Sequence, residues 1–240
     1  LEGFTSNYSI DLDGSDDYMG TPVDPSSIGT ADYSISLWFN INSGSTQDHP
    51  YFFAFGASSS GSTNTYVGLT LTQRSGDGYK VRVNNYFSSY SQSVSSSTSD
   101  VVAGNWYNVL LVRDGNLLTV YKNGASLITL TNSEVASNDL NQGSEFRIGY
   151  GYGAASRYIN GFIDEFAIFH SALSGTDATN IYNGGIPNNL GSDGLNLNPV
   201  NWWRMGDNNS GTGTVVNDAG SGGNNGSLES GATFSTTVPS

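Results

Sequence analysis

The chain has 240 residues, of which 36% are hydrophobic and 12% aromatic, enough for one sizeable core. The formal net charge of −13 comes from 21 acidic residues against 8 Lys and Arg, which makes nucleic acid and anionic lipid poor partners. Cys is absent, which excludes disulfides and a thiolate metal site, and no apolar run reaches the roughly 18 residues expected for membrane insertion.

The first half of the chain alternates apolar and polar side chains in short runs, as strands do when one face is buried. In "YSISLWFNI", residues 33–41, Tyr33, Ile35, Leu37, Phe39 and Ile41 share one side. That side is predicted to face the core, and the other side to be half hydrated. Further strands are predicted over residues 66–73 and 79–83. The Ser-rich stretches 56–64 and 88–99 are predicted to be surface loops.

The second half begins with "NWYNVLLVRDGNLLTVYKNGASLITL", in which two turn signals, Asp114-Gly115 and Asn123-Gly124, separate three β-rich segments. This pattern predicts a three-strand meander. Strands are also predicted over residues 145–150 and 158–169, and one short helix from the cap Ser174 to Gly184. The spacing predicts an all-β fold, a two-sheet antiparallel β-sandwich with one short helix.

The last part of the chain, residues 184–240, is rich in Gly and Asn and contains one compact apolar cluster, "VNWWRM". We expect residues 1–183 to form the sandwich and residues 184–240 to be an extension with about two strands. Either the extension packs back on the sandwich or it begins a further module. The first alternative is favoured, because two adjacent Trp would otherwise be exposed.

Two acids, Asp164 and Glu165, interrupt the apolar run "INGFIDEFAIF". Because side chains alternate along a strand, the two carboxylates should point to opposite faces, and one of them should be buried. A buried carboxylate requires backbone N–H groups, a cationic side chain or a metal as partner. The opening segment "SIDLDGSDDYM" supplies four Asp within seven residues, the oxygen-rich chemistry that Ca²⁺ prefers.

These motifs, taken in order, resemble the concanavalin A-like lectin/glucanase superfamily, and within it the laminin G-like jelly-roll domains. "LDGSDDYM" is similar to the opening strand and turn, "YSISLWFNI" to the Trp-bearing strand, and "INGFIDEFAIFHSALSGTDATNIYN" to the closing strand and helix. The resemblance covers about residues 8–183. "NWWRMGD" and the residues after it resemble a segment that usually precedes the opening strand, and the linker before it resembles bacteriophage structural proteins.

The resemblance implies a cation that links the first turn to the late strand. The positions of this sequence that match its ligands are Asp13 and Asp164. We therefore predict a structural Ca²⁺ with Asp13, Asp16 and Asp164 as ligands. The alternative is that the strand carboxylate accepts backbone N–H bonds while the Asp cluster is a solvated turn.

Some relatives in this superfamily are glycoside hydrolases, which need two carboxylates facing one cleft. Asp164 and Glu165 are consecutive, and Asp11 with Asp13 lies in a turn, so neither pair resembles a catalytic pair. The chain has two His, and neither has an orienting partner in sequence. We expect no enzymatic activity and assign no catalytic residue.

Aromatic residues gather in two segments that could contact a sugar or a protein. The first, "NNYFSSY", offers Tyr86, Phe87 and Tyr90, and the second, "YGYGAASRY", offers Tyr150, Tyr152, Arg157 and Tyr158. These seven residues are the predicted ligand-binding residues. The alternative is that Tyr simply suits sheet edges and rims.

Two functional classes follow. The first is a non-catalytic structural or interaction module, such as a virion decoration or fibre component or an extracellular component. The second is a carbohydrate-binding lectin or adhesin module. The expected partners are a virion or cell-surface protein, or a glycan, and the chain could also form a homo-oligomer. The sequence favours the first class slightly, because of its low charge and phage-like linker.

Overall fold

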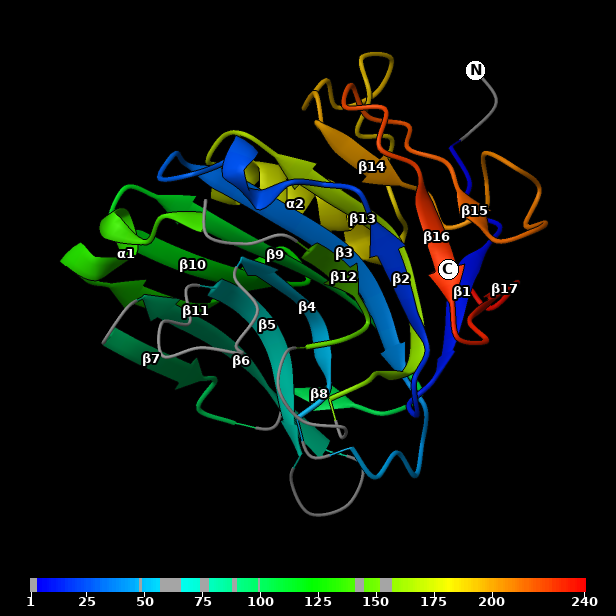
Figure 1. Ribbon diagram of the computed structural model, residues 1–240, viewed down its shortest axis with the longest axis horizontal. Helices are drawn as coiled ribbons and strands as arrows, with labels where there is room; N and C mark the ends of the chain where they lie inside the picture. Colours follow the sequence, from blue (N-terminus) through cyan, green and yellow to red (C-terminus); the bar gives the residue numbers. More distant parts are fainter. Residues whose placement is uncertain are drawn as a thin grey trace.

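The structure is a computed structural model that describes residues 4–47, 49–56, 66–73, 78–87, 90–98, 100–140, 145–151 and 157–240. Two antiparallel sheets pack face to face (Figure 1). This arrangement confirms the predicted all-β sandwich. In the described part of the chain, no helix is long and apolar enough to cross a membrane.

The first sheet has the strand order β11-β10-β9-β3-β13-β1-β17, and β14 also pairs with β13. Its strands are β1 (Ser9–Asp13), β3 (Tyr33–Ile41), β9 (Trp106–Asp114), β10 (Leu117–Lys122), β11 (Ala125–Thr131), β13 (Asn160–Phe169), β14 (Asn201–Trp203) and β17 (Thr233–Ser235).

The second sheet has the order β15-β16-β2-β12-β4-β5-β6-β7, with β8 paired to β6. Its strands are β2 (Tyr18–Thr21), β4 (Tyr51–Gly56), β5 (Tyr66–Gln73), β6 (Gly78–Phe87), β7 (Tyr90–Ser95), β8 (Val101–Val102), β12 (Glu145–Ile148), β15 (Val215–Val216) and β16 (Gly226–Glu229). The helical segments are α1 (Ser133–Ser137), α2 (Gly175–Tyr182) and the 3₁₀ turns Pro25–Ser27 and Asn183–Gly185.

The predicted meander is present as β9, β10 and β11. Asn123 and Gly124 both have positive φ angles, 49° and 76°, which the tight turn between β10 and β11 requires and which these two residues adopt readily. The turn between β9 and β10 has Gly115 at a φ of 55°. Local turn chemistry therefore sets the register of these strands.

The main core lies between the sheets and is rich in aromatic rings. Phe39 contacts Phe52 at a centroid distance of 4.2 Å, and Phe53 meets Phe166 edge to face at 5.7 Å. These rings are fully buried, which makes their packing a large part of the apolar burial.

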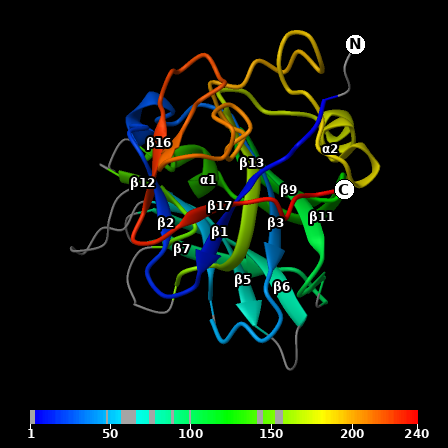
Figure 2. The same cartoon turned by 90° about the vertical axis from the view of Figure 1, so that its right-hand side faces the viewer.

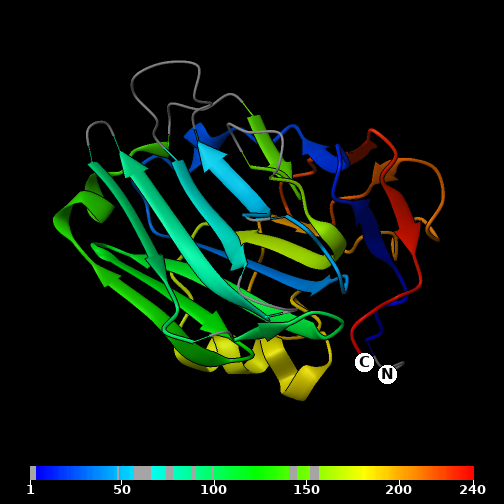
Figure 3. The same ribbon diagram turned by 90° about the horizontal axis from the view of Figure 1, so that it is seen from below.

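A second apolar cluster covers the outer face of the first sheet, where α2 lies below the sheet in Figure 3. Ser174 and Asp177 form a capping box at the start of this helix. Trp38 stacks on Tyr182 at 5.8 Å and is only 2% exposed. The expectation that this side of β3 is half hydrated is therefore wrong, because the helix after β13 covers it.

The C-terminal segment forms four short strands within the described chain rather than about two. Residues remote in sequence become neighbours: β16 pairs with β2, β17 with β1 and β14 with β13 (Figures 1 and 2). Trp202 and Trp203 are buried, at 5% and 0% exposed. Burial of these indoles against the sandwich holds the segment in place.

One loop prediction is wrong. Residues 90–95 form the edge strand β7, in which Val94 pairs with Val83 and packs on the core. Serine suits such a strand because its backbone still pairs with β6 while its small side chain reaches solvent. The other predicted Ser-rich loop lies largely outside the described residues.

Candidate functional site

A polar cavity of about 210 Å³ opens on the outer face of the second sheet. It is lined by residues of β4, β5 and β6 together with residues that precede β4 and β13: His49, Tyr51, Thr70, Arg82, Asn84, Tyr86 and Arg157. The volume is below the roughly 300–1,000 Å³ typical of pockets for drug-sized ligands, so the cavity suits a single small ring.

Strand alternation explains why these side chains gather here. On β6, Val81 and Val83 point into the main core, so Arg82, Asn84 and Tyr86 point outward. Thr70 of β5 pairs with Arg82 and contributes from the neighbouring strand.

The floor of the cavity is organised by the Tyr51 hydroxyl. This oxygen accepts hydrogen bonds from Asn84 Nδ2 at 2.7 Å and from Arg157 Nη1 at 3.3 Å. Two glycines make room for the ring: a Cβ on Gly151 would come within 2.3 Å of Tyr51 Cγ, and a Cβ on Gly68 within 2.9 Å of Tyr51 Cε1. The position of Tyr51 therefore depends on Gly at both places.

One wall of the cavity is aromatic. The rings of Tyr66 and Tyr86 stack at a centroid distance of 4.7 Å and an angle of 12°. The Tyr86 hydroxyl and Ser93 Oγ share a hydrogen bond of 3.1 Å, and Ser93 Oγ donates to Asn84 Oδ1. Burial raises the pKa of Tyr66, so its hydroxyl stays protonated. The site thus presents a rigid ring face beside amide, hydroxyl and guanidinium groups.

The cavity is positively charged within a strongly acidic chain. None of the described residues that line it is acidic, and two of the 8 basic residues of the chain line it. In the described part of the chain, no carboxylate pairs with Arg82 or Arg157, and the buried Nε of Arg82 has no hydrogen-bond partner. These donors are available to a ligand.

The predicted ligand-binding residues are divided by the structure. Tyr86 and Arg157, from the two predicted segments, meet in this cavity. Tyr150 and Tyr158 instead stack on each other at 4.4 Å, and Arg147 lies over Tyr150. Phe87 and Tyr90 pair across the end of β6 and β7, but their side chains lie outside the described residues, as does all of Tyr152.

The sequence reasoning missed His49, Tyr51, Thr70, Arg82 and Asn84. A signal was present in "KVRVNNYF", where Arg82, Asn84 and Tyr86 alternate with the apolar Val81 and Val83. The predicted strand over residues 79–83 ends before Asn84, whereas β6 continues to Phe87.

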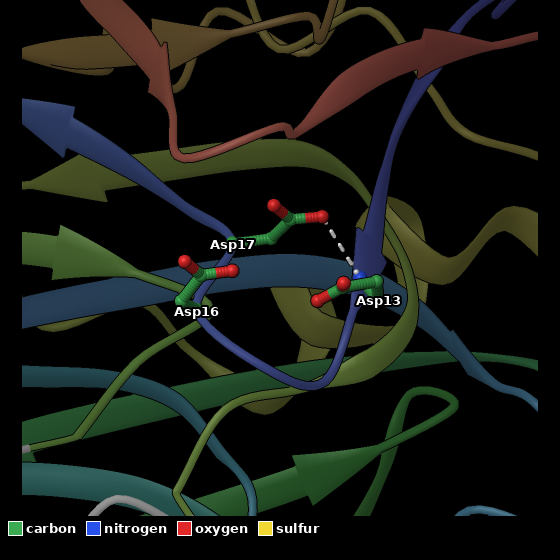
Figure 4. Close-up of side chains that lie close together, drawn as sticks. All are labelled: Asp13, Asp16 and Asp17. Carbon is green, nitrogen blue, oxygen red and sulfur yellow. Dashed lines mark hydrogen bonds between the residues drawn. The ribbon is translucent and has the colours of Figure 1, made fainter.

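The predicted metal ligands are also divided. Asp13, Asp16 and Asp17 lie close together on the turn between β1 and β2, with carboxylate oxygens within 4.8 Å of one another (Figure 4). The Asp13 amide donates to Asp17 Oδ2. Burial, together with the Asp13 and Asp16 carboxylates, raises the pKa of Asp17, against the effect of that hydrogen bond.

Asp164 does not join this group. Asp13 lies opposite Asn160 in the register of β1 and β13, so Asp164 is four residues farther along β13, about 13 Å away along the strand. Asp164 Oδ2 instead accepts a hydrogen bond from Ser6 Oγ at 2.5 Å. The structure therefore does not place one cation between Asp164 and the first turn.

A β-bulge explains the two consecutive acids. The pairing of β13 with β3 shifts by one residue between Asp164 and Ala167, and Glu165 adopts a φ of 48°, which is uncommon for a residue other than Gly. Ile163 and Phe166 both reach the main core, so both carboxylates lie on the outer face of the first sheet. The expectation that they point to opposite faces is wrong, because the bulge changes the alternation.

The two acids belong to a buried network that joins both ends of the chain. Trp202 Nε1 donates to Glu165 Oε2 at 2.6 Å, and Arg204 pairs with Glu165 at 3.2 Å and with Asp207 at 2.9 Å. Arg204 also donates to the carbonyl of Thr5. The partners of the strand carboxylates are thus protein groups, including the cation Arg204.

Burial has a large effect on both acids. It raises the pKa of Glu165 to about 7, although Arg204 and the Trp202 indole favour the charged form. Burial and the adjacent Glu165 carboxylate raise the pKa of Asp164 well above its usual value. The network places the cation Arg204 beside the three carboxylates of Asp164, Glu165 and Asp207. The carboxylates therefore retain a proton near neutral pH.

Residues 13–179, more than half of the chain, match the family model described as the concanavalin A-like lectin/glucanases superfamily. The chain belongs to this superfamily. The resemblance inferred from the strand motifs is thereby confirmed. No curated protein matches the chain significantly in sequence.

Solved structures with this fold include a candidate carbohydrate-binding protein of Bacteroides ovatus, 16% identical, with a TM-score of 0.71 over 98% of this chain and 62% of that one. The chain thus spans less than two thirds of that protein. A heptameric pentraxin of Limulus polyphemus is 15% identical, with a TM-score of 0.56 over 74% and 82% of the two chains.

The sialidase module CBM40 of Ruminococcus gnavus, solved with sialyllactose, is 12% identical to this chain. Its TM-score is 0.55 over 72% of this chain and 96% of that module. At these identities the likeness establishes the superfamily fold alone.

Proposed function

We propose that this chain is a carbohydrate-binding module that holds one sugar ring in the cavity lined by Tyr86, Asn84, Arg82 and Arg157. The observation that carries the proposal is the cavity itself: a ring face next to amide, hydroxyl and guanidinium groups on an open sheet face. Sugar C–H faces pack on aromatic rings, and their hydroxyls need such polar partners.

The comparisons support this proposal over a purely structural role. The Bacteroides protein and the Ruminococcus module are both named for carbohydrate binding, and both share the sandwich that presents the cavity. We therefore propose a lectin-like module rather than the structural module that the sequence alone favours slightly.

We further propose that binding occurs without catalysis. The described lining residues include no carboxylate, so they offer no pair of acids for glycoside hydrolysis. The strand acids Asp164 and Glu165 are buried on the other sheet. There, Trp202 and Arg204 donate hydrogen bonds to the Glu165 carboxylate.

A glycan array tests the proposal. The wild-type chain should bind a defined set of glycans, and Asn84→Ala should lose them because it removes the amide that bridges Tyr51 and Ser93. Asn180→Ala, on the exposed side of α2, should bind like wild type. An array without signal for the folded wild-type chain would overturn the proposal.

A virion or extracellular location, a likeness to bacteriophage structural proteins and a protein partner all remain predictions. The low charge and the Gly- and Asn-rich C-terminal segment motivate them. Stable co-purification with a capsid or fibre protein, without any glycan signal, would favour that class instead.

A further inference from the structure

Resting on the proposed function, we propose that the cavity selects an anionic sugar, whose carboxylate or sulfate group lies between the guanidinium groups of Arg82 and Arg157. The inference concerns the class of ligand and depends on how the cationic side chains of the chain are used.

The other described cationic side chains with known partners are satisfied within the protein. Arg113 donates to the carbonyls of Asn138 and Ala136, and Arg204 pairs with Glu165 and Asp207. Lys80 and Lys122 donate to the carbonyls of Ser97 and Asp100. The N–H donors of these side chains are therefore used in hydrogen bonds and ion pairs within the protein.

Arg82 and Arg157 are used differently. The Arg157 guanidinium lies over the Tyr51 ring at 5.4 Å and donates to the neutral Tyr51 hydroxyl, which uses one of its five N–H donors. No described residue accepts from the Arg82 guanidinium, and its Nε is buried. A buried cationic donor without an acceptor is costly, and an anionic ligand would remove that cost.

The net charge strengthens the argument. In a chain with a net charge of −13, an unspecialised surface would attract cations and repel anions. This cavity instead has two guanidinium groups, and none of the lining residues that the structure describes is an acid. Guanidinium groups bind carboxylates and sulfate-like groups through paired N–H···O bonds, whereas the Tyr86 ring remains for the sugar body.

Isothermal titration with matched sugars tests the inference. The probes are methyl glucuronide against methyl glucoside, and galactose 6-sulfate against galactose. The charged member of at least one pair should bind about tenfold tighter at low salt, and added salt should reduce that advantage. A preference within the first pair alone identifies a carboxylate, and within the second alone a sulfate.

Variants locate the preference. Arg82→Gln and Arg157→Gln should each weaken binding of the charged sugar more than binding of its neutral partner, so that the advantage falls from about tenfold to about threefold in each variant. Lys80→Gln removes the same charge from the same strand but lies outside the lining, so it should leave the advantage intact. Melting curves confirm that each variant is folded.

The outcomes separate the two proposals. If charged and neutral members bind equally well and Asn84→Ala abolishes both, the sugar-binding function stands and the anionic preference is overturned. If the advantage persists in the double variant R82Q/R157Q, the preference does not arise here and the inference also fails. If the array has already shown no glycan binding, both proposals fail together.

Discussion

The outer face of the first sheet is covered by α2 and the C-terminal segment, which leave Trp38 and Trp202 at most 5% exposed. The outer face of the second sheet instead carries Tyr86, Asn84 and Arg82 around an open cavity. Both faces are built from the same strand alternation. The covering segments, rather than the strands, decide which face remains available to a ligand.

The arginine side chains on the two faces also differ in their partners. On the covered face, Arg204 compensates two carboxylates and donates to the N-terminal segment. On the open face, Arg82 and Arg157 have no acidic partner among the described residues. Changes on the covered face should therefore alter stability, and changes on the open face should alter binding.

The largest effect is expected from Trp202→Ala on the covered face. The change removes a buried indole and the hydrogen bond that it donates to Glu165, so the free energy of unfolding should fall by about 3–5 kcal/mol. Denaturant titration measures the loss. Sugar affinity of the folded variant should match wild type, and a loss of affinity equal to that of Asn84→Ala would break the contrast between the two faces.

A pH dependence of similar size should come from Glu165. Its folded-state pKa of about 7 is above the usual 4.5, so folding takes up a proton between these values. The stabilisation is fully present below pH 4.5 and is lost as the pH rises through 7, by up to about 3 kcal/mol. Asp164 acts in the same direction. Unfolding titrations from pH 5 to 8 measure the slope.

Glu165→Gln is the matched variant, since it keeps the shape of the side chain and removes the titration. Its stability curve should be flatter than that of wild type over the same range. A wild-type stability that increases steadily between pH 5 and 8 would contradict the proposed protonation of the network.

On the open face, Gly151→Ala should place a methyl group against the Tyr51 ring, at 2.3 Å from Cγ. Displacement of this ring should cost about 1–3 kcal/mol of stability and should weaken sugar binding. Gly20→Ala, whose nearest contact would be an ordinary 3.6 Å, is the control. Calorimetry should show reduced affinity for the first variant alone; equal affinities would mean that Tyr51 does not organise the site.

The smallest effect concerns the predicted Ca²⁺. Of its predicted ligands, Asp13 and Asp16 lie together but Asp164 does not, and we propose Asp17 as the third ligand in its place. Bound Ca²⁺ should raise stability by about 1.4 kcal/mol at ten times its dissociation constant. Asp16→Asn should remove the effect, whereas Asp164→Asn should not, because Asp164 lies elsewhere along β13. Melting curves with and without a chelator that coincide for wild type would refute the metal site.

The fold could be predicted because its signals are local. Alternation in residues 33–41 and the Asn-Gly turn after Lys122 depend only on neighbouring residues. The bulge at Glu165 could not be predicted, since a strand residue with positive φ is stabilised by Trp202 and Arg204, which are remote in sequence.

The candidate site was predictable only in part. Tyr86 and Arg157 were found because aromatic and basic residues stand out in a weakly charged chain. Arg82 and Asn84 were missed because their availability depends on which outer sheet face the C-terminal segment covers. That information lies in the packing of α2, Leu190 and Trp202 on the outer face of the first sheet.

The central claim is that the open face of the second sheet binds a sugar. A crystal structure of the chain with an array-selected oligosaccharide tests it most directly. The account predicts one sugar ring against Tyr86, with polar contacts to Arg82 and Arg157. A sugar bound at the stacked Tyr150 and Tyr158, or at the turn that carries Asp13 and Asp16, with this cavity unoccupied, would contradict it.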